Sequence, residues 1–497
     1  MKIHNRTAGA GAMAGLLALL TLQGCAAVGP NYQKPEIQTP DAWTEKVAEQ
    51  VARGPESSLQ TWWTVFEDPV LDDLIERCRR ENLDLKIAVS RVNQSRTILA
   101  IARGEKQPVA DAGASASVSK LSDDGPLEEV APPGGFETRG LFQLGIDAVW
   151  EIDVFGRVRR SIEAAGAVYE ASVEDYRDVL VTLFAEVGLA YTDVRGAQQR
   201  IVYARDNAEA QRESLAIAED LYENGVASKL DVVQARANLA STQAAIPTFE
   251  IGLNRALNRL AVLLGQDAGS LQAELAATAP IPTPKEAIGI GVPADVLRQR
   301  PDIRRTERLL AAQTAEIGVA TADLYPRFGL SGFFGLQSRS LSNLFDASSL
   351  TFGLSAPIQW NFLNGGRVRN NISLQDEKAN ERMLQYEKKV LQAIEEVENS
   401  IVGFNLNRKR RQLLETATDS TVEAVDLVLV QYQTGLTDFN NVLTTQRDLF
   451  GQQDQLVATE TDVVMNLIAL YKALGGGWDL EQTIQLAVVD PPPAESR

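Results

Sequence analysis

Few residues of this 497-residue chain could carry out chemistry. It has one histidine, His4, and two cysteines, Cys25 and Cys78. His4 lies in an N-terminal leader, so the processed chain lacks the commonest general base and metal ligand of proteins. The sequence contains no phosphate-binding loop and no HExxH, GxSxG or CxxC motif. We therefore expect no enzyme, no metal and no diffusible cofactor, although composition leaves a pair of catalytic carboxylates open.

The leader has the features of a secretory signal. Lys2 and Arg6 precede an apolar run of 15 residues from Ala8 to Leu22. This run is too short, and too interrupted by glycine, for a helix that spans a membrane. We predict a signal peptide over residues 1–24.

The leader ends in "LQGC", residues 22–25, which matches the bacterial lipobox. In that motif the mature chain begins at an acylated cysteine. We therefore expect an N-acyl chain, such as palmitate, and a diacylglycerol on Cys25. The alternative is a free or disulfide-bonded Cys25 with Cys78 as its one possible partner. The helical spacing around Cys78 instead predicts a buried packing position.

The charge of the chain limits its partners. The formal net charge is −18, and loss of Lys2 and Arg6 with the leader makes it 46 − 66 = −20. The remaining basic residues are scattered along the sequence. An acidic exported chain repels nucleic acid, so we expect no nucleic-acid partner.

An internal duplication organises the chain, and most of it follows an offset of 210 residues. The matching positions are Trp150, Gly156, Arg157, Val158, Arg159, Tyr222, Gly225, Val232, Leu239, Leu257, Leu260, Leu264 and Gly265, which recur as Trp360, Gly366, Arg367, Val368, Arg369, Tyr432, Gly435, Val442, Leu449, Leu467, Leu470, Leu474 and Gly475. Upstream, Asp84, Ala102 and Pro108 match Asp302, Ala320 and Pro326 at an offset of 218. The extra 8 residues fall in the polar stretch "LSDDGPLEEVAPPGGFETRG", which predicts a longer exposed loop in the first copy.

Each copy shows the same predicted order of elements: a helix of about 35 residues, two strands, one long helix, a tight turn and a returning helix. The first repeat covers 71–265, with strands 109–120 and 141–150, a long helix 157–223 and a return helix 228–264. The second repeat covers 293–475, with strands 327–338 and 350–360, a long helix 366–433 and a return helix 437–474. An N-terminal segment 25–70, a linker 266–292 and a tail 476–497 complete the chain.

The long helix of the first copy carries a heptad seam, which is typical of coiled-coil packing. Its members are Ile162, Tyr169, Val173, Tyr176, Leu180, Leu183, Val187, Ala190, Val194, Ala197, Ile201, Ala204, Ala208, Leu215, Ala218 and Tyr222, with Gly166 and Gln211 as exceptions. The 67 residues of this helix, at about 1.5 Å each, make a rod of roughly 100 Å. In the return helix, Pro247 predicts a kink or a break.

The strands alternate apolar and polar residues over about ten positions and end in an aromatic residue. Apolar positions include Phe142, Leu144, Ile146, Ala148, Trp150, Phe328, Leu330, Phe334, Leu336, Leu350, Phe352, Leu354, Ala356, Ile358 and Trp360. This pattern is typical of a membrane β-barrel with one face to lipid and one to water. The edge of a soluble sandwich is the alternative.

Four strands are too few to close a barrel, since the smallest membrane barrels have about eight. An open edge in lipid would leave backbone groups without partners, so several copies must close it together. Two, three or four copies would supply 8, 12 or 16 strands, and the residues alone leave this number open.

Six stretches, in order, resemble the NodT/OprM lipoprotein branch of the TolC-like outer membrane factors. They are "VGPNYQKPEIQTPDAW", "WWTVFEDPVLDDLI", "RPDIRRTERLLAAQTAEIGVATADLYPRFGLSG", "YENGVASKLDVVQA", "YQTGLTDFNNVLTTQRDLF" and "YKALGGGWDL". The resemblance implies a homotrimer whose 12-stranded β-barrel in the outer membrane continues into a periplasmic 12-helix α-barrel. In this arrangement segment 25–70 runs along the barrel to an equatorial region, to which the linker 266–292 and the tail 476–497 belong.

The resemblance also implies a function and partners. The chain would be the exit duct of a tripartite efflux system, with a periplasmic adaptor, an inner-membrane pump of the RND type and outer membrane lipid as partners. The system would expel drugs, metal ions or other toxic solutes and so confer antibiotic resistance. One alternative is a TolC-type duct for protein secretion. A periplasmic coiled-coil lipoprotein is another, but it does not account for the strands.

The resemblance places the site at the two helix turns. The predicted adaptor-contact residues are Tyr222, Gly225, Val226, Tyr432, Gly435 and Leu436, and the predicted aperture residues are Asp231, Asp438, Asn441 and Thr444. Related sequences have an acid where this chain has Thr444, which puts a second acidic ring in doubt. For Asp231 and Asp438, helix capping is the alternative to a role in the aperture.

Overall fold

The structure is a computed structural model that describes residues 27–37, 40, 43–44, 57–122, 136–283 and 299–478. The chain forms two compact units. Unit 1 comprises residues 1–35, 94–171 and 307–385, and unit 2 comprises 36–93, 172–306 and 386–497. The predicted signal peptide, Cys25, residues 284–292 of the linker and residues 479–497 of the C-terminal tail lie outside the described residues.

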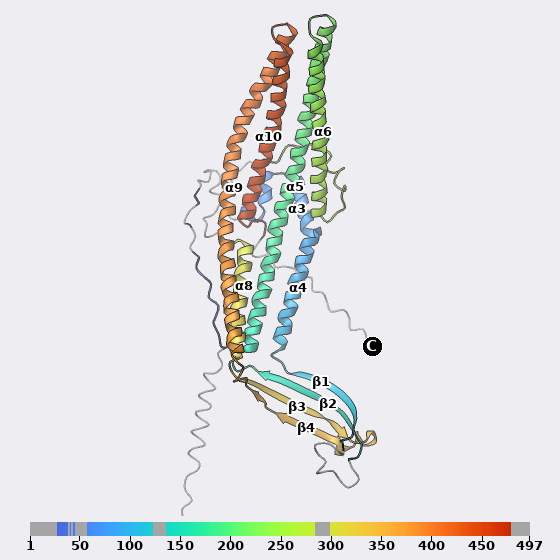
Figure 1. The fold of residues 1–497 in the computed structure, drawn as a ribbon, viewed down its shortest axis with the longest axis vertical. Coiled ribbons are helices and arrows are strands. Elements are labelled where there is room, and N and C mark those ends of the chain that lie inside the picture. The colour runs from blue at the N-terminus through green and yellow to red at the C-terminus, as the bar shows by residue number, and fades with distance from the viewer. Residues whose placement is uncertain are drawn as a thin grey trace, which may run out of the picture. The chain divides into compact units, whose positions relative to one another are not determined.

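Unit 1 contains a sheet and parts of four helices (Figure 1). The strands are β1 (Val109–Ser119), β2 (Arg139–Ile152), β3 (Arg327–Ser338), β4 (Leu350–Ser355) and β5 (Ile358–Gln359). The helices are α4 (Leu83–Gly104), α5 (Arg157–Glu223), α8 (Pro301–Ala322) and α9 (Arg367–Gln433), with the 3-10 turns η3 (Leu341–Asn343) and η4 (Ala347–Ser349). Both long helices have 67 residues; α5 has the predicted bounds, and α9 begins one residue later than predicted.

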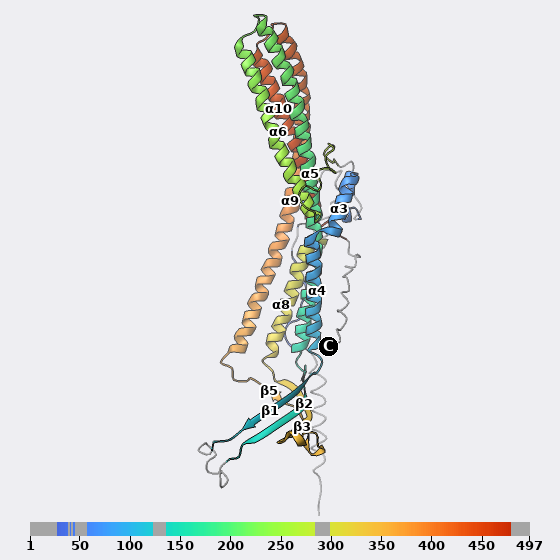
Figure 2. The ribbon, with the colours of Figure 1, turned by 90° about the vertical axis from the view of Figure 1, so that its right-hand side faces the viewer.

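Unit 2 is helical in its described part. It adds α2 (Ser57–Gln60), η1 (Trp62–Phe66), α3 (Pro69–Glu81), α6 (Lys229–Leu263) and α10 (Phe439–Ala473) to the remaining parts of α4, α5, α8 and α9. The hairpins α5/α6 and α9/α10 lie side by side in this unit (Figures 1 and 2). None of the helices in the described ranges is long and apolar enough to cross a membrane.

The sheet is antiparallel in the order β1-β2-β3-β4, with β5 also paired to β3. Its register places Ile146 opposite Phe334 and Phe334 opposite Phe352, so the apolar residues of successive strands share one face. That face is exposed in the single chain, and Phe352 retains 78% of its accessible surface. This register confirms the predicted alternation of apolar and polar positions.

The predicted strand 350–360 is wrong in one respect, because two strands, β4 and β5, occupy this range. Pro357 lies between them and has no backbone N–H to donate to the ladder. Its carbonyl still accepts a hydrogen bond from Gly329 at 2.9 Å, so both segments remain on β3. β2 is two residues longer at each end than the predicted 141–150.

The duplication is visible in equivalent hydrogen bonds. The indole N–H of Trp150 donates to the carbonyl of Lys106, and that of Trp360 donates to Leu324, both at 3.0 Å. The donors differ by 210 residues and the acceptors by 218, as the two offsets predict. Between the paired strands, 19 residues connect β1 to β2 and 11 connect β3 to β4, so the difference is the predicted 19 − 11 = 8.

The N-terminal segment of unit 1 is held by one arginine. Arg160, which is buried on α5, donates to the carbonyl of Val28 at 3.0 Å and to Asn31 Oδ1 at 2.7 Å. The N–H of Val28 donates to Phe155 at 3.0 Å. These contacts fix the segment that directly follows the predicted lipidation site.

The predicted first helix of about 35 residues is wrong, because two helices, α3 and α4, meet at Asn82. Asp68 caps α3 by accepting from Val70 and Leu71, and Pro69 occupies the first turn. At the junction, the buried Asn82 caps α4 through Leu85 N–H and donates to the carbonyl of Leu263 at 2.8 Å. Its side chain therefore replaces backbone bonds that a continuous helix would make.

Of the kink or break predicted at Pro247, the break is wrong, because α6 continues through this residue. Buried residues lie on both sides of the proline, among them Thr242 and Leu257. Packing of the two halves therefore outweighs the loss of one helical hydrogen bond. The return helices are two or three residues shorter than predicted, since α6 and α10 begin at Lys229 and Phe439 and end at Leu263 and Ala473.

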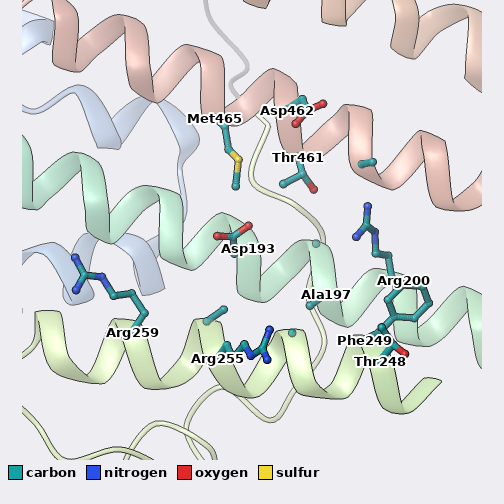
Figure 3. A pocket seen from close by; sticks show the side chains of 14 residues that line it. Asp193, Ala197, Arg200, Thr248, Phe249, Arg255, Arg259, Thr461, Asp462 and Met465 are labelled. Atoms are coloured by element: carbon teal, nitrogen blue, oxygen red, sulfur yellow. The ribbon is translucent and has the colours of Figure 1, made fainter. Parts of the chain in front are cut away.

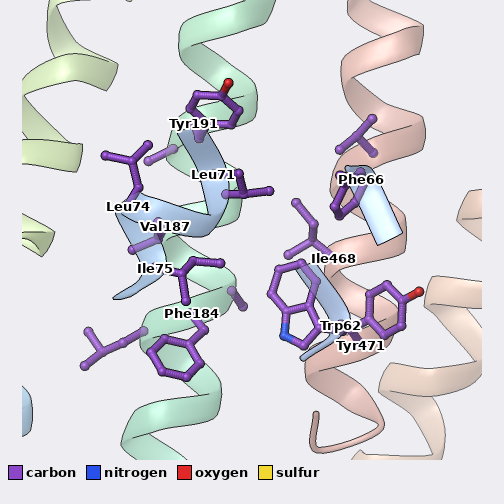
Figure 4. Packing of buried hydrophobic residues seen from close by; sticks show 14 of the residues in the cluster. Trp62, Phe66, Leu71, Leu74, Ile75, Phe184, Val187, Tyr191, Ile468 and Tyr471 are labelled. Carbon is purple, nitrogen blue, oxygen red and sulfur yellow. The ribbon is translucent and has the colours of Figure 1, made fainter. Parts of the chain in front are cut away.

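Unit 2 has one large core, which we call the large cluster (Figure 4). Trp62 is stacked on Tyr471 of α10 at 5.3 Å between ring centres, and Trp63 packs edge-on against Phe184 of α5. Cys78 is buried in this cluster, as predicted, and burial and the charge of Glu186 raise the pKa of its thiol to about 12. The two tryptophans of the stretch "WWTVFEDPVLDDLI" thus pack in the core of unit 2.

Four glycines end helices in the same way. Gly225, Gly435, Gly265 and Gly475 have φ between +68° and +75°. In each case the glycine N–H and the next N–H donate to carbonyls three and five residues back, which is the Schellman motif. The motifs form two pairs at the 210-residue offset, so the duplication extends to the helix ends.

These glycines differ in their surroundings, which leads to a prediction. A side chain added at Gly265 would meet the carbonyl oxygen of Glu81 at 2.7 Å, whereas one at Gly225 would meet open space. We expect Gly225→Ala to lower the free energy of unfolding by about 1–2 kcal/mol from backbone strain. Gly265→Ala should cost about 1–3 kcal/mol more through overpacking. Thermal unfolding of the two purified variants tests this order, and equal midpoints would contradict it.

Candidate functional site

The two turns predicted to form the site lie in unit 2, one between α5 and α6 and one between α9 and α10. Space around the Cα atoms of Gly225 and Gly435 is open. Val226 and Leu436, the residues that follow, expose 70% and 79% of their surface. Two large apolar side chains at the surface of a turn are available to a partner.

The two turns are unequal in their tyrosines. Tyr222 is 44% exposed, whereas Tyr432 is only 6% exposed. The Tyr432 ring packs edge-on against Phe439 at 5.2 Å. It belongs to a small core that we call the turn cluster, composed of Ala218, Val232, Ala235, Tyr432, Phe439, Val442 and Leu443. Tyr432 therefore supports the turn from inside, in contrast to the surface contact expected from the sequence.

The predicted acids occupy different positions in their helices. Asp438 is the N-cap of α10 and accepts from Asn441 N–H at 3.2 Å. At the equivalent position of α6 the N-cap is Ser228, whose hydroxyl donates to Asp231 Oδ1 at 2.7 Å. For Asp438 the structure thus shows the capping role. Asp231 is equivalent to Asn441 and lies at the third residue of its helix, where a carboxylate also complements the dipole.

The remaining aperture residues are satisfied locally. The side-chain amide of Asn441 donates to Thr437 Oγ1 at 2.7 Å. The hydroxyl of Thr444 donates to the carbonyl of Asn440 at 2.9 Å. Both residues are exposed on the single chain, so their polar groups line a wet surface of α10.

One contact joins the two turns. The hydroxyl of Tyr432 donates to Asp231 Oδ2 at 3.2 Å, across 201 residues of sequence. Burial and the charge of Asp231 raise the pKa of Tyr432 to about 12, so the phenol keeps its proton at neutral pH. Tyr432 and Asp231 therefore connect the α5/α6 turn to the α9/α10 turn. Sequence reasoning named both residues but missed their contact, because no local pattern encodes it.

A buried ionic network at the start of α8 was also missed. Arg300 pairs with Asp302 at 2.7 Å and with Glu396 at 2.7 Å, and Lys389 pairs with Asp302 at 3.0 Å. Burial would raise the pKa of Asp302, but hydrogen bonds and charges from Arg300 and Lys389 lower it to about 2. Arg300 also donates to the carbonyl of Ala473 at 2.7 Å, as Asn82 does to Leu263 in the first repeat.

A surface groove of about 620 Å³ lies between α5, α6 and α10 (Figure 3). Small residues, including Gly196, Ala197 and Gly252, line it together with charged side chains. Arg200 lies over the Phe249 ring at 5.7 Å and pairs with Asp454 at 3.1 Å. Its charge is therefore neutralised within the wall. Among the described residues, no group of His, Cys, Asp or Glu is arranged to hold a metal ion.

Comparison with known proteins decides the family. The family model for the outer membrane efflux protein matches residues 74–266 and 292–476. The chain belongs to the outer membrane efflux protein family. This family consists of efflux channels, and it is not an enzyme family.

Individual relatives match over nearly the whole length. The solvent efflux pump outer membrane protein SrpC of Pseudomonas putida is 31% identical over 476 residues, which cover 94% of this chain and 98% of SrpC. Nodulation protein T of Rhizobium leguminosarum bv. trifolii is 30% identical, with 93% and 96% covered. The solved outer-membrane channel OprN is 34% identical with a TM-score of 0.85, and the match covers 91% of this chain and all of OprN.

These matches confirm the expected fold and location. The chain has the TolC-like fold of outer membrane channels and is an outer membrane efflux protein. The duplication, the long helices and the five-stranded sheet arise from this fold. Lipidation of Cys25 stays a prediction, because that residue lies outside the described part of the chain.

Proposed function

We propose that the chain is the exit channel of a tripartite efflux system that expels small toxic solutes, such as drugs or metal ions, across the outer membrane. The observation that carries this proposal is the exposed apolar face of the sheet in a chain that also carries two paired helical hairpins. A lipid-facing sheet and long periplasmic helices suit a conduit. The relatives named for solvent and toluene efflux favour small solutes.

The proposed channel is a homotrimer. Within the described residues, β1 pairs with β2 alone and β4 with β3 alone, so each of these outer strands has an edge without a strand partner. Lipid does not satisfy backbone hydrogen bonds, so neighbouring copies must pair these edges. Three copies would give 12 strands, a number that falls within the range of known membrane barrels.

The proposed lipid anchor is Cys25. Ala27 packs so closely against Gly156 that a Cβ atom on this glycine would lie 2.4 Å from the Cβ of Ala27, and Val28 bonds to Phe155. Cys25 is two residues upstream of Ala27, which allows a reach of about 7 Å. Acyl chains on Cys25 would therefore enter lipid near the junction of β2 and α5, as an anchor additional to the barrel.

The proposed partners are a periplasmic adaptor and an inner-membrane pump of the RND type. The exposed Val226 and Leu436 give an adaptor two apolar contacts per chain. The sequence has no phosphate-binding loop, so a partner must supply the energy for transport.

Deletion of the gene tests the proposed function. We expect the deletion strain to become sensitive to some antibiotics, dyes, solvents or metal ions, and complementation to restore resistance. Unchanged resistance together with loss of an exported protein would instead favour a duct for protein secretion.

The contact between the turns predicts a change in conductance. Asp231→Ala removes the acceptor of Tyr432 and one charge near the turns, so we expect altered single-channel conductance and weaker block by cations in planar bilayers. Tyr432→Phe removes the contact but keeps the charge. If conductance depends on the contact, both variants change it; if it depends on charge, only Asp231→Ala does. If the conductance traces of Asp231→Ala were identical to those of wild type, Asp231 would have only a capping role.

A further inference from the structure

The core of the hairpins in unit 2 is apolar at two places and polar between them. The large cluster lies at one end and the turn cluster at the other. Between them, alongside the buried Ile201, Ala204, Ala208 and Leu239, lie buried amides and hydroxyls from four helices, which we call the polar layer. It consists of Asn207, Gln211 and Ser214 on α5, Asn238 and Thr242 on α6, Thr418 on α9, and Gln446 with the half-buried Gln453 on α10.

Part of this layer is paired across helices. Gln446 donates to Ser214 Oγ at 2.7 Å, and Asn207 donates to Gln453 Oε1 at 2.5 Å. Arg447 donates to Asn238 Oδ1 at 3.1 Å. These bonds link α5 to α10 and α6 to α10 through side chains that shift easily, in contrast to the interlocked packing of an apolar seam.

Another part has no partner. Gln211 is 2% exposed, yet both its amide nitrogen and its oxygen lack hydrogen-bond partners among the described residues. The same holds for the hydroxyl of the buried Thr418. Burying an amide or a hydroxyl without a hydrogen-bond partner is costly, and ordered water can supply the partner at a polar site of this kind. Gln211 is also one of the two residues that interrupt the heptad seam of α5, with Gly166.

We propose that the polar layer is a hydrated boundary at which the section from the layer to the helix turns opens independently of the large cluster. A buried polar position in a coiled coil sets register but lowers stability. The turn cluster is small, with 7 buried members, so few apolar contacts hold this section closed. The inference goes beyond the proposed function, because local opening can be measured whatever the channel exports.

Hydrogen–deuterium exchange on the full-length oligomer in detergent tests the proposal. We expect amides of the layer, in segments 205–216 and 444–455, and of the turn section, in 217–223 and 437–443, to exchange at least about tenfold faster than those of the large cluster, in 180–194 and 457–471. A uniform rate along α5 and α10 would overturn the proposal, even if no variant were made.

A double variant sharpens the test. Gln211→Leu with Thr418→Val makes the layer apolar and should slow exchange in the layer and turn section about tenfold. The matched control is Thr459→Val, which removes the hydroxyl of a buried threonine that already donates to the carbonyl of Gln455 at 2.8 Å. The control should leave the layer unchanged. No slowing in the double variant, or equal slowing in the control, would contradict the proposal.

Discussion

Replacing Phe352 with arginine is expected to prevent accumulation of the assembled protein in the outer membrane. Phe352 is 78% exposed on the apolar face of the sheet, opposite Phe334. Arginine on the lipid face of a membrane barrel costs about 2–4 kcal/mol at the bilayer midplane. In an assembly of identical chains each copy carries that cost. The amount of heat-stable oligomer in isolated outer membranes measures the effect.

The neighbouring residue supplies the control. Thr351 pairs with Gly335 and points to the opposite, polar face. Thr351→Arg should therefore assemble nearly as well as the unmodified protein. Equal assembly of both arginine variants would show that the apolar face does not meet lipid.

Replacing Arg300 with methionine should give the largest loss of stability in unit 2. The change leaves the buried Asp302 with Lys389 as its remaining ion-pair partner, beside the N–H of Ile303, and removes the donor to the carbonyl of Ala473. Breaking a buried ion pair from one side costs about 3–5 kcal/mol. Thermal unfolding of the purified variant should show a clear drop in the midpoint.

Arg305→Met, five residues further along the chain on α8, is the matched control. Arg305 pairs with Asp175 at 2.7 Å, but both side chains are partly exposed, at 35% and 26%. Exposed pairs contribute at most about 1 kcal/mol, so the midpoint should change little. If Arg305→Met destabilised the protein as much as Arg300→Met, burial of the Arg300 network would not be the cause.

The network also predicts a pH dependence. The pKa of Asp302 is lowered from 3.8 to about 2 in the folded chain, so its ionised form stabilises the fold. This contribution is complete above about pH 4 and is lost as the pH falls toward 2. The stability difference between wild type and Arg300→Met should therefore narrow by about 2 kcal/mol over that range. A constant difference would contradict the assignment.

The long-range periodicity of the chain made most of the fold predictable. The heptad seam gave α5 its bounds, and its members from Leu180 to Ala218 are largely buried. The alternation placed Phe334 and Phe352 on one face of the sheet, as the register confirms. The duplication paired Trp150 with Trp360, and the structure gives the two indoles equivalent hydrogen bonds. Such patterns can be recognised in a sequence because the same physical requirement, such as burial of one face, applies to many residues at regular spacing.

Individual side chains that decide a local outcome were less predictable. The break at Asn82 depends on one amide that bonds to Leu263, far away in sequence. Continuity through Pro247 depends on packing along both halves of α6. At the site, the internal repeat suggested equal roles for Tyr222 and Tyr432. In the structure, neighbouring side chains bury Tyr432, whereas Tyr222 is exposed. These outcomes follow from tertiary contacts, which a single sequence does not display.

The unequal tyrosines have a consequence for stoichiometry. At the two turns, a protein that recognises an accessible aromatic ring would find one such ring per chain, at Tyr222, because Tyr432 is enclosed. A protein that recognises the exposed aliphatic residue after the glycine of each turn would find two such residues per chain, Val226 and Leu436. The number of molecules of the proposed adaptor bound per channel would therefore show whether they recognise the aromatic ring or the aliphatic side chains.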